Sequence, residues 1–466
     1  MKPFSKPLLL LLAVLMAGTA VHAQQAPKRV YNLQEAIAHA LENNASVKNE
    51  RINEGIATAQ VKETVAEGLP QINVAGNLTY NIQRQVSFLP GDFIGQPGTF
   101  VPVAFGTPYT SNAGATLSQL IFNGSYFVGL QASKVYKELA AKNLEKAKIE
   151  VAEAVALAYY GALVSEERLE LLAVNMGRLD TLYRETKAMN ENGFAEAIDV
   201  QRVQVNLNNL RTEYQNVERS MAINLNVLKF QMGIPVDQEI ELAENISDYK
   251  LEDIAFAEDV PYSQRIEYQQ LNINRELARL DIKNTRMQYL PNLSVFANAG
   301  YTAGRTTFGE FFEPTVLRSE NENGEVIEQV VDTWNPYAAV GLNLNIPVFD
   351  GFLKANTIRR KKLIADQVDI QIQNLENSIN LEIEQAQVNL RNSLQSLETQ
   401  QENIELAQEV FRVSSIKYQE GIGSNLEVIE AENALKTAET NYYQALYNAL
   451  VARVAYNKAT GTLLQK

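Results

Sequence analysis

An internal repeat constrains the fold of this chain more than any other feature of its sequence. Four landmarks of the first half return in the same order in the second half, at offsets of 221 to 228 residues. The matched pairs are Leu69 with Leu290, Phe122 with Phe349, Gly193 with Gly421, and Gly233 with Gly461. Matched landmarks in one order indicate duplication. We therefore expect one fold made of two similar halves, residues 24–260 and 261–466.

Each half contains short segments in which apolar residues alternate with small polar ones. In 72–80, Ile72 and Val74 share one face of an extended chain, while Asn73 and Asn77 share the other. This period of two predicts strands, and it suits strands that lie between lipid and a water-filled lumen. The alternative is a set of half-buried strands in a soluble domain. The expected strands are 71–81, 111–121, 292–302 and 337–347.

The segments that flank these strands differ in character. Helices are expected over 32–66 and 262–287, because each ends before a Leu-Pro pair and proline closes a helix. The stretches 81–110 and 302–335 are rich in glycine, proline, asparagine and phenylalanine, and we interpret them as extended loops. Only four strands per chain are expected. Four strands cannot close a wide barrel, so several chains must contribute to one.

Two long stretches without proline predict long helices that pack as coiled coils. Over 125–190, small and apolar residues recur every three or four positions, and the same spacing recurs over 435–456. A helix of about 66 residues would be roughly 100 Å long.

Glycines interrupt these helices where the chain must reverse. Gly193 does so in the first half, and Gly421 and Gly423 do so in the second. Glycine supplies the left-handed backbone that ends a helix. Ser424 or Asn425 can then cap the helix that follows. We expect a helix-hairpin tip at each of these two places.

The first residues have the pattern of a secretory signal peptide. Lys2 and Lys6 precede an apolar run that is too short to span a bilayer, and the small residues at 21–23 fit a cleavage site. We expect a cleaved signal peptide over 1–23 and a protein that is periplasmic, secreted or inserted in an outer membrane.

Composition argues against several classes of function. The formal charge is −14, and −16 without Lys2 and Lys6, which argues against nucleic acid as a partner. The chain has no cysteine, hence no thiol nucleophile and no cysteine for a lipid anchor. His39 is the only histidine beyond the expected signal peptide. We therefore expect no enzyme activity, no cofactor and no metal site.

Several motifs together resemble those of the TolC-like outer-membrane efflux proteins. They are the opening "YNLQEAIAHALENNASVK" (31–48), the two Leu-Pro strand entries, the "FNG" and "FDG" steps, and the stretch "KYQEGIGSNLEVIEAENAL" (417–435). The resemblance implies a homotrimer with a shared 12-stranded β-barrel in the outer membrane, continued by a long periplasmic α-helical barrel. It implies a passive export duct of a tripartite efflux or type I secretion system. The implied partners are outer-membrane lipid, a periplasmic membrane-fusion adaptor, and an inner-membrane transporter of the RND or ABC type.

The resemblance also assigns roles to residues near the tips. The acidic residues that line the family's closed periplasmic entrance fall on Glu427 and Glu430, and Asp199 is the repeat-equivalent of Glu427. The alternative is that Glu427 and Glu430 are solvated carboxylates in the first turns of a helix. The family's arginine near this tip falls on Gly423, and Arg202 is a weak substitute.

The tip residues expected to contact the adaptor are Gly193, Gly421, Gly423 and Ser424.

Two other functions compete with a duct. A periplasmic or surface coiled-coil structural protein would need no alternating strands. An autonomous diffusion porin would place most of its length in strands rather than in long helices.

Overall fold

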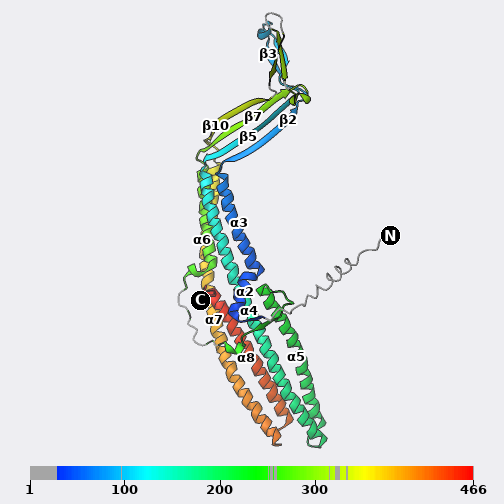
Figure 1. The fold of residues 1–466 in the computed structure, drawn as a ribbon. Coiled ribbons are helices and arrows are strands. Elements are labelled where there is room, and N and C mark those ends of the chain that lie inside the picture. Colours follow the sequence, from blue (N-terminus) through cyan, green and yellow to red (C-terminus); the bar gives the residue numbers. More distant parts are fainter. Residues whose placement is uncertain are drawn as a thin grey trace, which may run out of the picture. The chain divides into compact units, whose positions relative to one another are not determined.

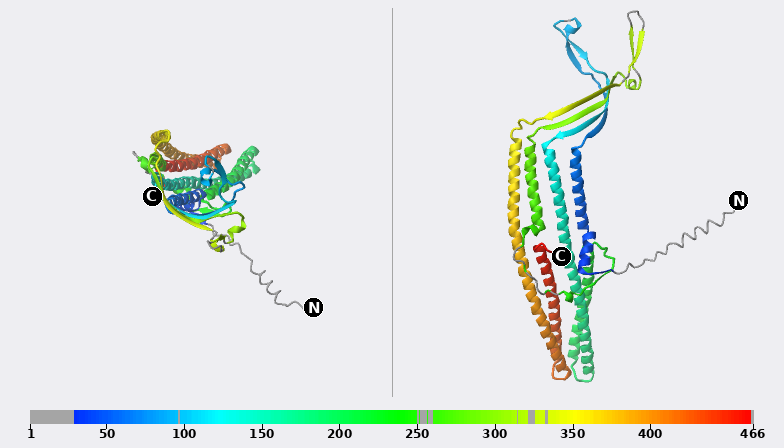
Figure 2. Two further views of the ribbon diagram at one scale, coloured as in Figure 1. Left: turned by 90° about the horizontal axis from the view of Figure 1, so that it is seen from above. Right: turned by 60° about the vertical axis from the view of Figure 1, so that its left-hand side comes forward.

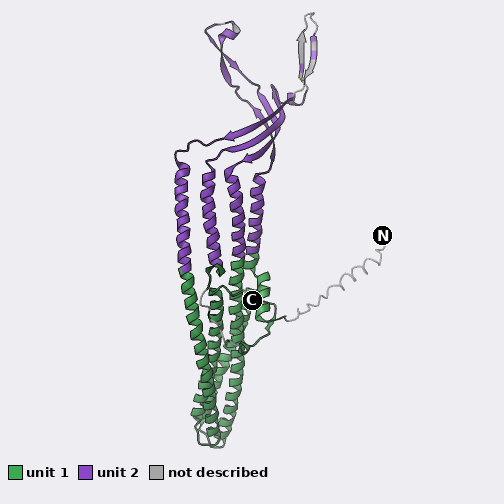
Figure 3. Ribbon diagram, turned by 90° about the vertical axis from the view of Figure 1, so that its left-hand side faces the viewer, with its two compact units in different colours: residues 1–49, 145–265, 377–466 green, residues 50–144, 266–376 purple. Residues whose placement is uncertain are grey.

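The computed structural model describes residues 29–464, apart from 96, 250, 252–255, 257–259, 314, 321–325 and 332–333. The expected signal peptide, 1–23, lies outside the described residues. The chain divides into two compact units, and each draws on both halves of the sequence (Figure 3). Unit 1 draws on Met1–Asn49, Glu145–Arg265 and Asn377–Lys466, and unit 2 on Glu50–Leu144 and Ile266–Glu376.

Unit 2 contains a four-stranded antiparallel sheet with the strand order β10-β7-β5-β2 (Figure 1). Its strands are β2 (Gln71–Tyr80), β5 (Tyr109–Phe122), β7 (Asn292–Arg305) and β10 (Asn335–Asn345). The four strands expected from the alternating pattern are therefore confirmed. Strands β2 and β10 form the two edges, and they run in opposite directions because three antiparallel pairings separate them.

The register of this sheet gathers its apolar residues on one face. Ile72 lies opposite Leu117, Leu117 opposite Ala297, and Ala297 opposite Val340. The large side chains that this face leaves 36–81% exposed are Ile72, Val74, Leu78, Tyr80, Leu117, Tyr301, Val340, Leu342 and Leu344. The other face carries asparagine, threonine and serine side chains from the same strands, together with several glycines, Phe296 and Tyr337. The sheet thus has an exposed apolar face and an uncharged polar face.

Two hairpins lie inside the stretches that the sequence predicted as loops. Strand β3 (Val86–Pro90) pairs with β4 (Phe100–Ala104), and β8 (Thr315–Glu320) pairs with β9 (Val326–Val331). The loop interpretation of 81–110 and 302–335 was therefore wrong for these segments. It rested on their glycine and proline content, whereas β-branched and aromatic residues favour pairing within them.

Short elements account for further strands and turns. Strand β1 (Arg29–Tyr31) pairs in parallel with β6 (Ile240–Leu242) in unit 1. The expectation of only four strands per chain was thus also wrong. The 3-10 helices are η1 (Gly91–Ile94), η2 (Ile246–Asp248), η3 (Tyr262–Gln264) and η4 (Gly309–Phe311).

The helix predicted over 32–66 is interrupted at Asn44. Helix α2 (Leu33–Asn43) ends there, and α3 (Ala45–Glu67) begins at the next residue. Asn44 has an extended backbone, with φ −60° and ψ 137°. Its side-chain oxygen accepts a hydrogen bond from Ser46 N at 2.8 Å, and its Nδ2 donates to Gln231 O at 2.7 Å. Asn44 therefore caps the start of α3 and also binds a residue of unit 1 that is distant in the sequence.

Long helices make up most of the described chain. They are α4 (Gly124–Glu191), α5 (Ala197–Met232), α6 (Ile266–Met287), α7 (Leu353–Gln419) and α8 (Asn425–Ala459). The long helix expected over 125–190 and the helix expected over 262–287 are confirmed by α4 and α6. Among the described residues, no helix has both the length and the apolar character needed to cross a membrane.

Apolar clusters hold these helices together within each unit. In unit 1, α4 contributes Leu172, Leu179 and Leu182 to a cluster with residues of α5 and α8. A second cluster joins α7 to α8 through Leu390 and Tyr456. In unit 2, α4 packs on α6 through Val128, Val135, Ile273 and Leu280. Apolar residues that recur every three or four positions in the sequence thus form the core between the helices.

Candidate functional site

The two helical hairpins of unit 1 reverse through turns of the same construction (Figure 2). Gly193 follows α4 with φ +80°, and Gly421 follows α7 with φ +74°. In each turn the next residue donates its N–H to the carbonyl five positions back: Phe194 to Met189 at 2.8 Å, and Ile422 to Lys417 at 3.0 Å. The left-handed backbone expected at Gly193 and Gly421 is confirmed, and this bonding closes the last turn of each helix.

Gly423 is required for a different reason than the sequence suggested. It is not among the residues with positive φ. A Cβ atom there would lie 2.9 Å from Lys417 Cβ and 3.0 Å from Tyr418 N, so a side chain would collide with the end of α7. Ser424 then caps α8, because its Oγ accepts a hydrogen bond from Glu427 N at 3.2 Å. A glycine and a serine thus let α8 begin close to the end of α7.

The acidic residues predicted near the tips lie in the first turns of α5 and α8. Glu427 and Glu430 are exposed in the single chain. Asp199 is partly buried, and its carboxylate lies 3.7 Å from Arg202 Nη1, so its charge is partly compensated. Within the described ranges there is no group of three or more histidine or acidic side chains that could hold a metal ion.

Two exposed apolar side chains at the tips were not selected from the sequence. Phe194 and Ile422 directly follow Gly193 and Gly421, and each is 80% exposed. Their positions differ by the same 228 residues as the two glycines, which is the signal that could have found them. Both turns thus present one large apolar side chain to the solvent.

A small polar cluster connects the C-terminal end of α7 to α4. Tyr418 OH lies 3.3 Å from Thr186 Oγ1 on α4, and Asn425 Nδ2 on α8 donates to the same Thr186 oxygen at 3.0 Å. Tyr418 OH also lies 3.5 Å from Met189 Sδ. Thr186 and Asn425 are buried, so these contacts are shielded from water. Tyr418, Thr186 and Asn425 thus fix the second tip against the helix that leads to the first.

A charged cluster is buried between α4 and α8. Arg178 Nε donates to Glu432 Oε1 at 3.1 Å, and its Nη2 lies 3.6 Å from Glu439 Oε1. Asn175 accepts from Arg178 and donates to Glu439 Oε2 at 3.3 Å. Glu432 and Glu439 are 3% and 7% exposed. Both carboxylates are therefore shielded from water between α4 and α8.

Burial also alters the titration of this cluster. Removal of Glu432 from water raises the pKa of its carboxyl group, and the attraction of Arg178 opposes that shift. Phe411 on α7 lies beside the cluster, with its ring centroid 5.5 Å from the Arg178 guanidinium carbon. The three helices α4, α7 and α8 therefore meet at this cluster.

The polar face of the sheet contains a second cluster of residues that are fitted to one another, centred on Tyr337. Gly114 and Gly300 lie opposite each other on β5 and β7. Tyr337 on β10 lies across them, so that a Cβ at either glycine would come within 2.8 Å of its hydroxyl oxygen. That hydroxyl donates to Asn112 Oδ1 on β5 at 3.0 Å. An aromatic ring thus covers part of the polar face above two residues without side chains.

Comparison with known proteins gives consistent results. The family model described as "Outer membrane efflux protein" matches residues 36–233 and 263–462, one segment in each half of the chain. The probable efflux pump outer membrane protein TtgC of Pseudomonas putida is 22% identical over 437 residues, which cover 92% of this chain and 82% of that protein. The outer membrane protein TolC of Vibrio cholerae is 19% identical over 440 residues, which cover 93% of this chain and 92% of that protein.

A solved structure supports the same fold. The open state of the Neisseria gonorrhoeae MtrE outer membrane channel matches 92% of this chain and 89% of its own length, with a TM-score of 0.70 and 16% sequence identity. At that identity the likeness concerns the fold alone. The two segments matched by the family model confirm the internal repeat inferred from the sequence.

Proposed function

Because this chain belongs to the outer membrane efflux protein family, we propose that it forms an outer-membrane channel, a passive export duct from the periplasm to the exterior. The names of its relatives, which describe outer membrane components of efflux pumps, support this proposal. An enzymatic role has no support in a family of ducts.

The open sheet of unit 2 is the observation that carries the proposal. Edge strands β2 and β10 have no partner strand within the described chain. Exposed edges of this length invite pairing with another chain. Since β2 and β10 run in opposite directions, β10 of one copy can continue the antiparallel order with β2 of the next. Three copies joined in this way form a closed 12-stranded barrel, in a homotrimer.

The two faces of the sheet suit such a barrel in a membrane. The apolar face would contact outer-membrane lipid, and the uncharged polar face would line a water-filled lumen. Tyr80 and Tyr109 lie opposite each other at one end of the apolar face, with ring centroids 4.7 Å apart. Aromatic residues at the end of a lipid-facing band are typical of outer-membrane barrels. The helices of three chains would form a periplasmic α-helical barrel.

The hairpin tips are proposed as the surface that meets the pump. A membrane-fusion adaptor and an inner-membrane transporter of the RND or ABC type would supply the energy that a duct lacks. Phe194 and Ile422 are the exposed side chains best suited to adaptor contact. The turn residues that present them are Gly193, Gly421, Gly423 and Ser424.

The carboxylates of the second tip are proposed as the periplasmic entrance. Glu427 and Glu430 are three residues apart and exposed, so one helix face presents both. Repeated around a threefold axis, they would form an acidic constriction. Asp199 is a weaker candidate because Arg202 lies beside it.

The remaining assignments follow the same scheme. Residues 1–23 would be a cleaved signal peptide, and the mature chain would have no lipid anchor. Residues 24–260 and 261–466 would be the two repeats, each with strands and a helical hairpin. The rival function, a coiled-coil structural protein without channel activity, leaves the open sheet edges without a role.

Cysteine cross-linking tests the proposed barrel, since the natural chain has no cysteine. Asn73 on β2 would be replaced by cysteine together with Ala339, Asn343 or Asn345 on β10. Within one chain β2 and β10 are separated by β5 and β7, a gap of about 14 Å at usual strand spacing. A short bifunctional maleimide should therefore link neighbouring copies into dimers and trimers in outer-membrane fractions. Products that stay monomeric at all three pairs would contradict a shared barrel.

Conductance tests the duct itself. Purified protein in planar bilayers should conduct ions, and a chain lacking β2 to β5 should not. A structural coiled-coil protein would conduct in neither form.

A further inference from the structure

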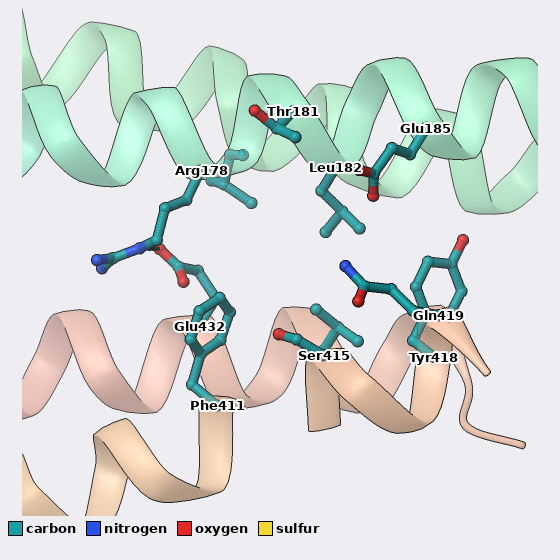
Figure 4. A pocket seen from close by; sticks show the side chains of 11 residues that line it. Arg178, Thr181, Leu182, Glu185, Phe411, Ser415, Tyr418, Gln419 and Glu432 are labelled. Atoms are coloured by element: carbon teal, nitrogen blue, oxygen red, sulfur yellow. Dashed lines mark hydrogen bonds and ion pairs between the residues drawn. The ribbon is translucent and has the colours of Figure 1, made fainter. Parts of the chain in front are cut away.

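A pocket of about 300 Å³ opens in unit 1 where α4, α7 and α8 meet (Figure 4). Its volume is at the lower end of the range for small-molecule sites. Apolar walls come from Leu179 and Leu182 on α4, Phe411 on α7 and Val428 on α8. The pocket therefore has an apolar body built by three helices.

Polar atoms inside this pocket lack partners. Glu432 lines it, is 3% exposed, and has one carboxylate oxygen, Oε2, that is buried without a hydrogen bond within the described chain. Ser415 also lines it, and its buried Oγ has no partner among the described residues. A buried polar atom without a partner costs about 1–3 kcal/mol. The pocket thus offers unused hydrogen-bonding capacity.

The unused capacity favours a donor with positive charge. An ionised carboxylate has no hydrogen to donate, so Glu432 Oε2 in that form acts only as a hydrogen-bond acceptor. Arg178, the one cation of the pocket wall, is already shared by Glu432 and Glu439. Glu185 adds a further carboxylate to the wall (Figure 4). Carboxylates therefore outnumber the single guanidinium here.

From these observations we propose that the pocket between α4, α7 and α8 binds an amphipathic amine, whose ammonium group donates to Glu432 Oε2 and Ser415 Oγ while its apolar body packs against Leu182, Phe411 and Val428. This inference goes beyond the export function and does not depend on it. Burial raises the pKa of the Glu432 carboxyl group, and the attraction of Arg178 and Lys436 opposes that shift.

Occupancy has a physical consequence for the helices. The ligand contacts α4 on one side and α7 and α8 on the other, so it binds the arrangement in which these helices are packed together. A ligand that binds one arrangement of a protein stabilises that arrangement. The bound amine should thus hold the second hairpin against α4.

Three probes that share one apolar body test the charge preference. Phenylbutylamine, phenylbutanol and phenylbutyrate carry a cation, a neutral hydroxyl and an anion on the same frame. Binding to the full-length protein in detergent would be measured near neutral pH by calorimetry and by the shift in melting temperature. Phenylbutylamine should bind saturably and raise the melting temperature, and the other two should bind at least about tenfold more weakly.

Variants locate the site. Glu432→Gln should weaken phenylbutylamine binding about tenfold or more, because it removes the charge and keeps the shape. Glu405→Gln, an exposed carboxylate on α7 outside the pocket, is the matched control and should leave binding unchanged. Ser415→Leu fills the pocket without touching the Arg178 ion pair and should abolish binding. It serves as the second test if Glu432→Gln does not fold.

Three outcomes would overturn the proposal. Equal binding of all three probes would show that the pocket does not select charge. Tighter binding of phenylbutyrate would make Arg178 the recognition group and the ligand an anion. Phenylbutylamine binding that survives Ser415→Leu in a folded protein would place its site elsewhere.

Discussion

Tyr337 on β10 donates a hydrogen bond to Asn112 on β5, at 3.0 Å, and so bridges across the intervening strand β7. The bridge is possible because Gly300 on β7 and Gly114 on β5 have no side chain beneath the ring. Residues of three strands are thus fitted to one another: Asn112 and Gly114 on β5, Gly300 on β7, and Tyr337 on β10. Around Tyr337, the surface that we propose to face the lumen therefore has a fixed shape.

Gly300→Ala should disrupt this surface. The added Cβ would lie 2.5 Å from Ala113 O and 2.8 Å from Tyr337 OH, and the first of these contacts is with backbone that cannot move aside. Overpacking of this kind costs about 1–3 kcal/mol. We expect less heat-resistant assembled protein in outer-membrane fractions, measured by gel migration with and without boiling.

Gly76→Ala is the matched control for Gly300→Ala. It lies in β2 of the same sheet, and its added Cβ would meet no atom closer than 3.8 Å. Assembly of Gly76→Ala should match that of the natural protein. Equal losses in both variants would mean that any alanine harms this sheet and that the fit around Tyr337 is not special.

Gly421→Val should damage the second hairpin tip. Its backbone has φ +74°, where a residue with a β-carbon is strained by roughly 1–2 kcal/mol. Because the substitution is confined to the turn, export should fall more than membrane insertion does. Export of a known pump substrate and the amount of protein in the outer membrane would be measured side by side.

Gly177→Ala controls for the loss of a glycine within unit 1. It lies inside α4, where an added Cβ meets nothing within 4 Å, so it should be neutral or stabilise the helix by up to about 1 kcal/mol. If Gly421→Val reduces insertion as much as export, the glycine serves folding alone. Gly193→Val at the first tip should behave like Gly421→Val.

The features that the sequence predicted well are those encoded by local spacing. Helix α4 follows from a proline-free stretch with regular apolar steps, and β2 from a strict alternation around Ile72 and Val74. The break at Asn44 could not be predicted in this way. Its side chain is held by Gln231 O, 187 residues away, and local spacing carries no information about that partner.

In the candidate sites, too, local features were predictable and features that depend on distant residues were not. The left-handed glycines and the cap at Ser424 are local features, and both were predictable. The burial of Glu432 was not, because its partner Arg178 lies 254 residues away in the sequence. Taken alone, Glu432 looks like any acidic residue of an exposed coiled-coil face. Only the packing of α8 on α4 removes it from water.

Stability should depend on pH through Glu432. Burial raises the pKa of this carboxyl group in the folded protein above its ordinary value of 4.5, against the attraction of Arg178 on α4 and Lys436 on α8 and with the repulsion of Glu439 on α8. The folded state then binds the proton more tightly than the unfolded state. The stability contributed by this group is therefore fully present below about pH 4.5 and is lost as pH rises through the raised pKa.

Glu432→Gln makes this dependence measurable. The variant lacks the titrating group, so the melting temperature of the natural protein minus that of the variant should fall as pH rises from 4.5 towards neutrality. Raising the folded-state pKa by one changes this contribution to the free energy of unfolding by about 1.4 kcal/mol. A difference that instead grows with pH would mean that attraction to Arg178 outweighs burial and that the folded-state pKa is lowered.

The last prediction concerns the proposed entrance at Glu427 and Glu430. Six carboxylates around one threefold axis should attract cations and bind divalent ions, as acidic rings do in cation channels. Channels in planar bilayers should therefore prefer cations, and the preference should weaken on adding Mg²⁺ or on acidification, since protonated carboxyl groups carry no charge. The variant with both Glu427→Gln and Glu430→Gln should lose most of the preference and of the Mg²⁺ effect.

Trimer assembly should not change in the double variant, because both side chains are exposed and the amides keep their shape. Arg202→Gln is the informative companion, since it frees Asp199 from its neighbouring cation at the other tip. If the double variant keeps its cation preference and Arg202→Gln strengthens it, then Asp199 lines the entrance. Glu427 and Glu430 would then be ordinary carboxylates in the first turns of α8, favoured there by the helix dipole.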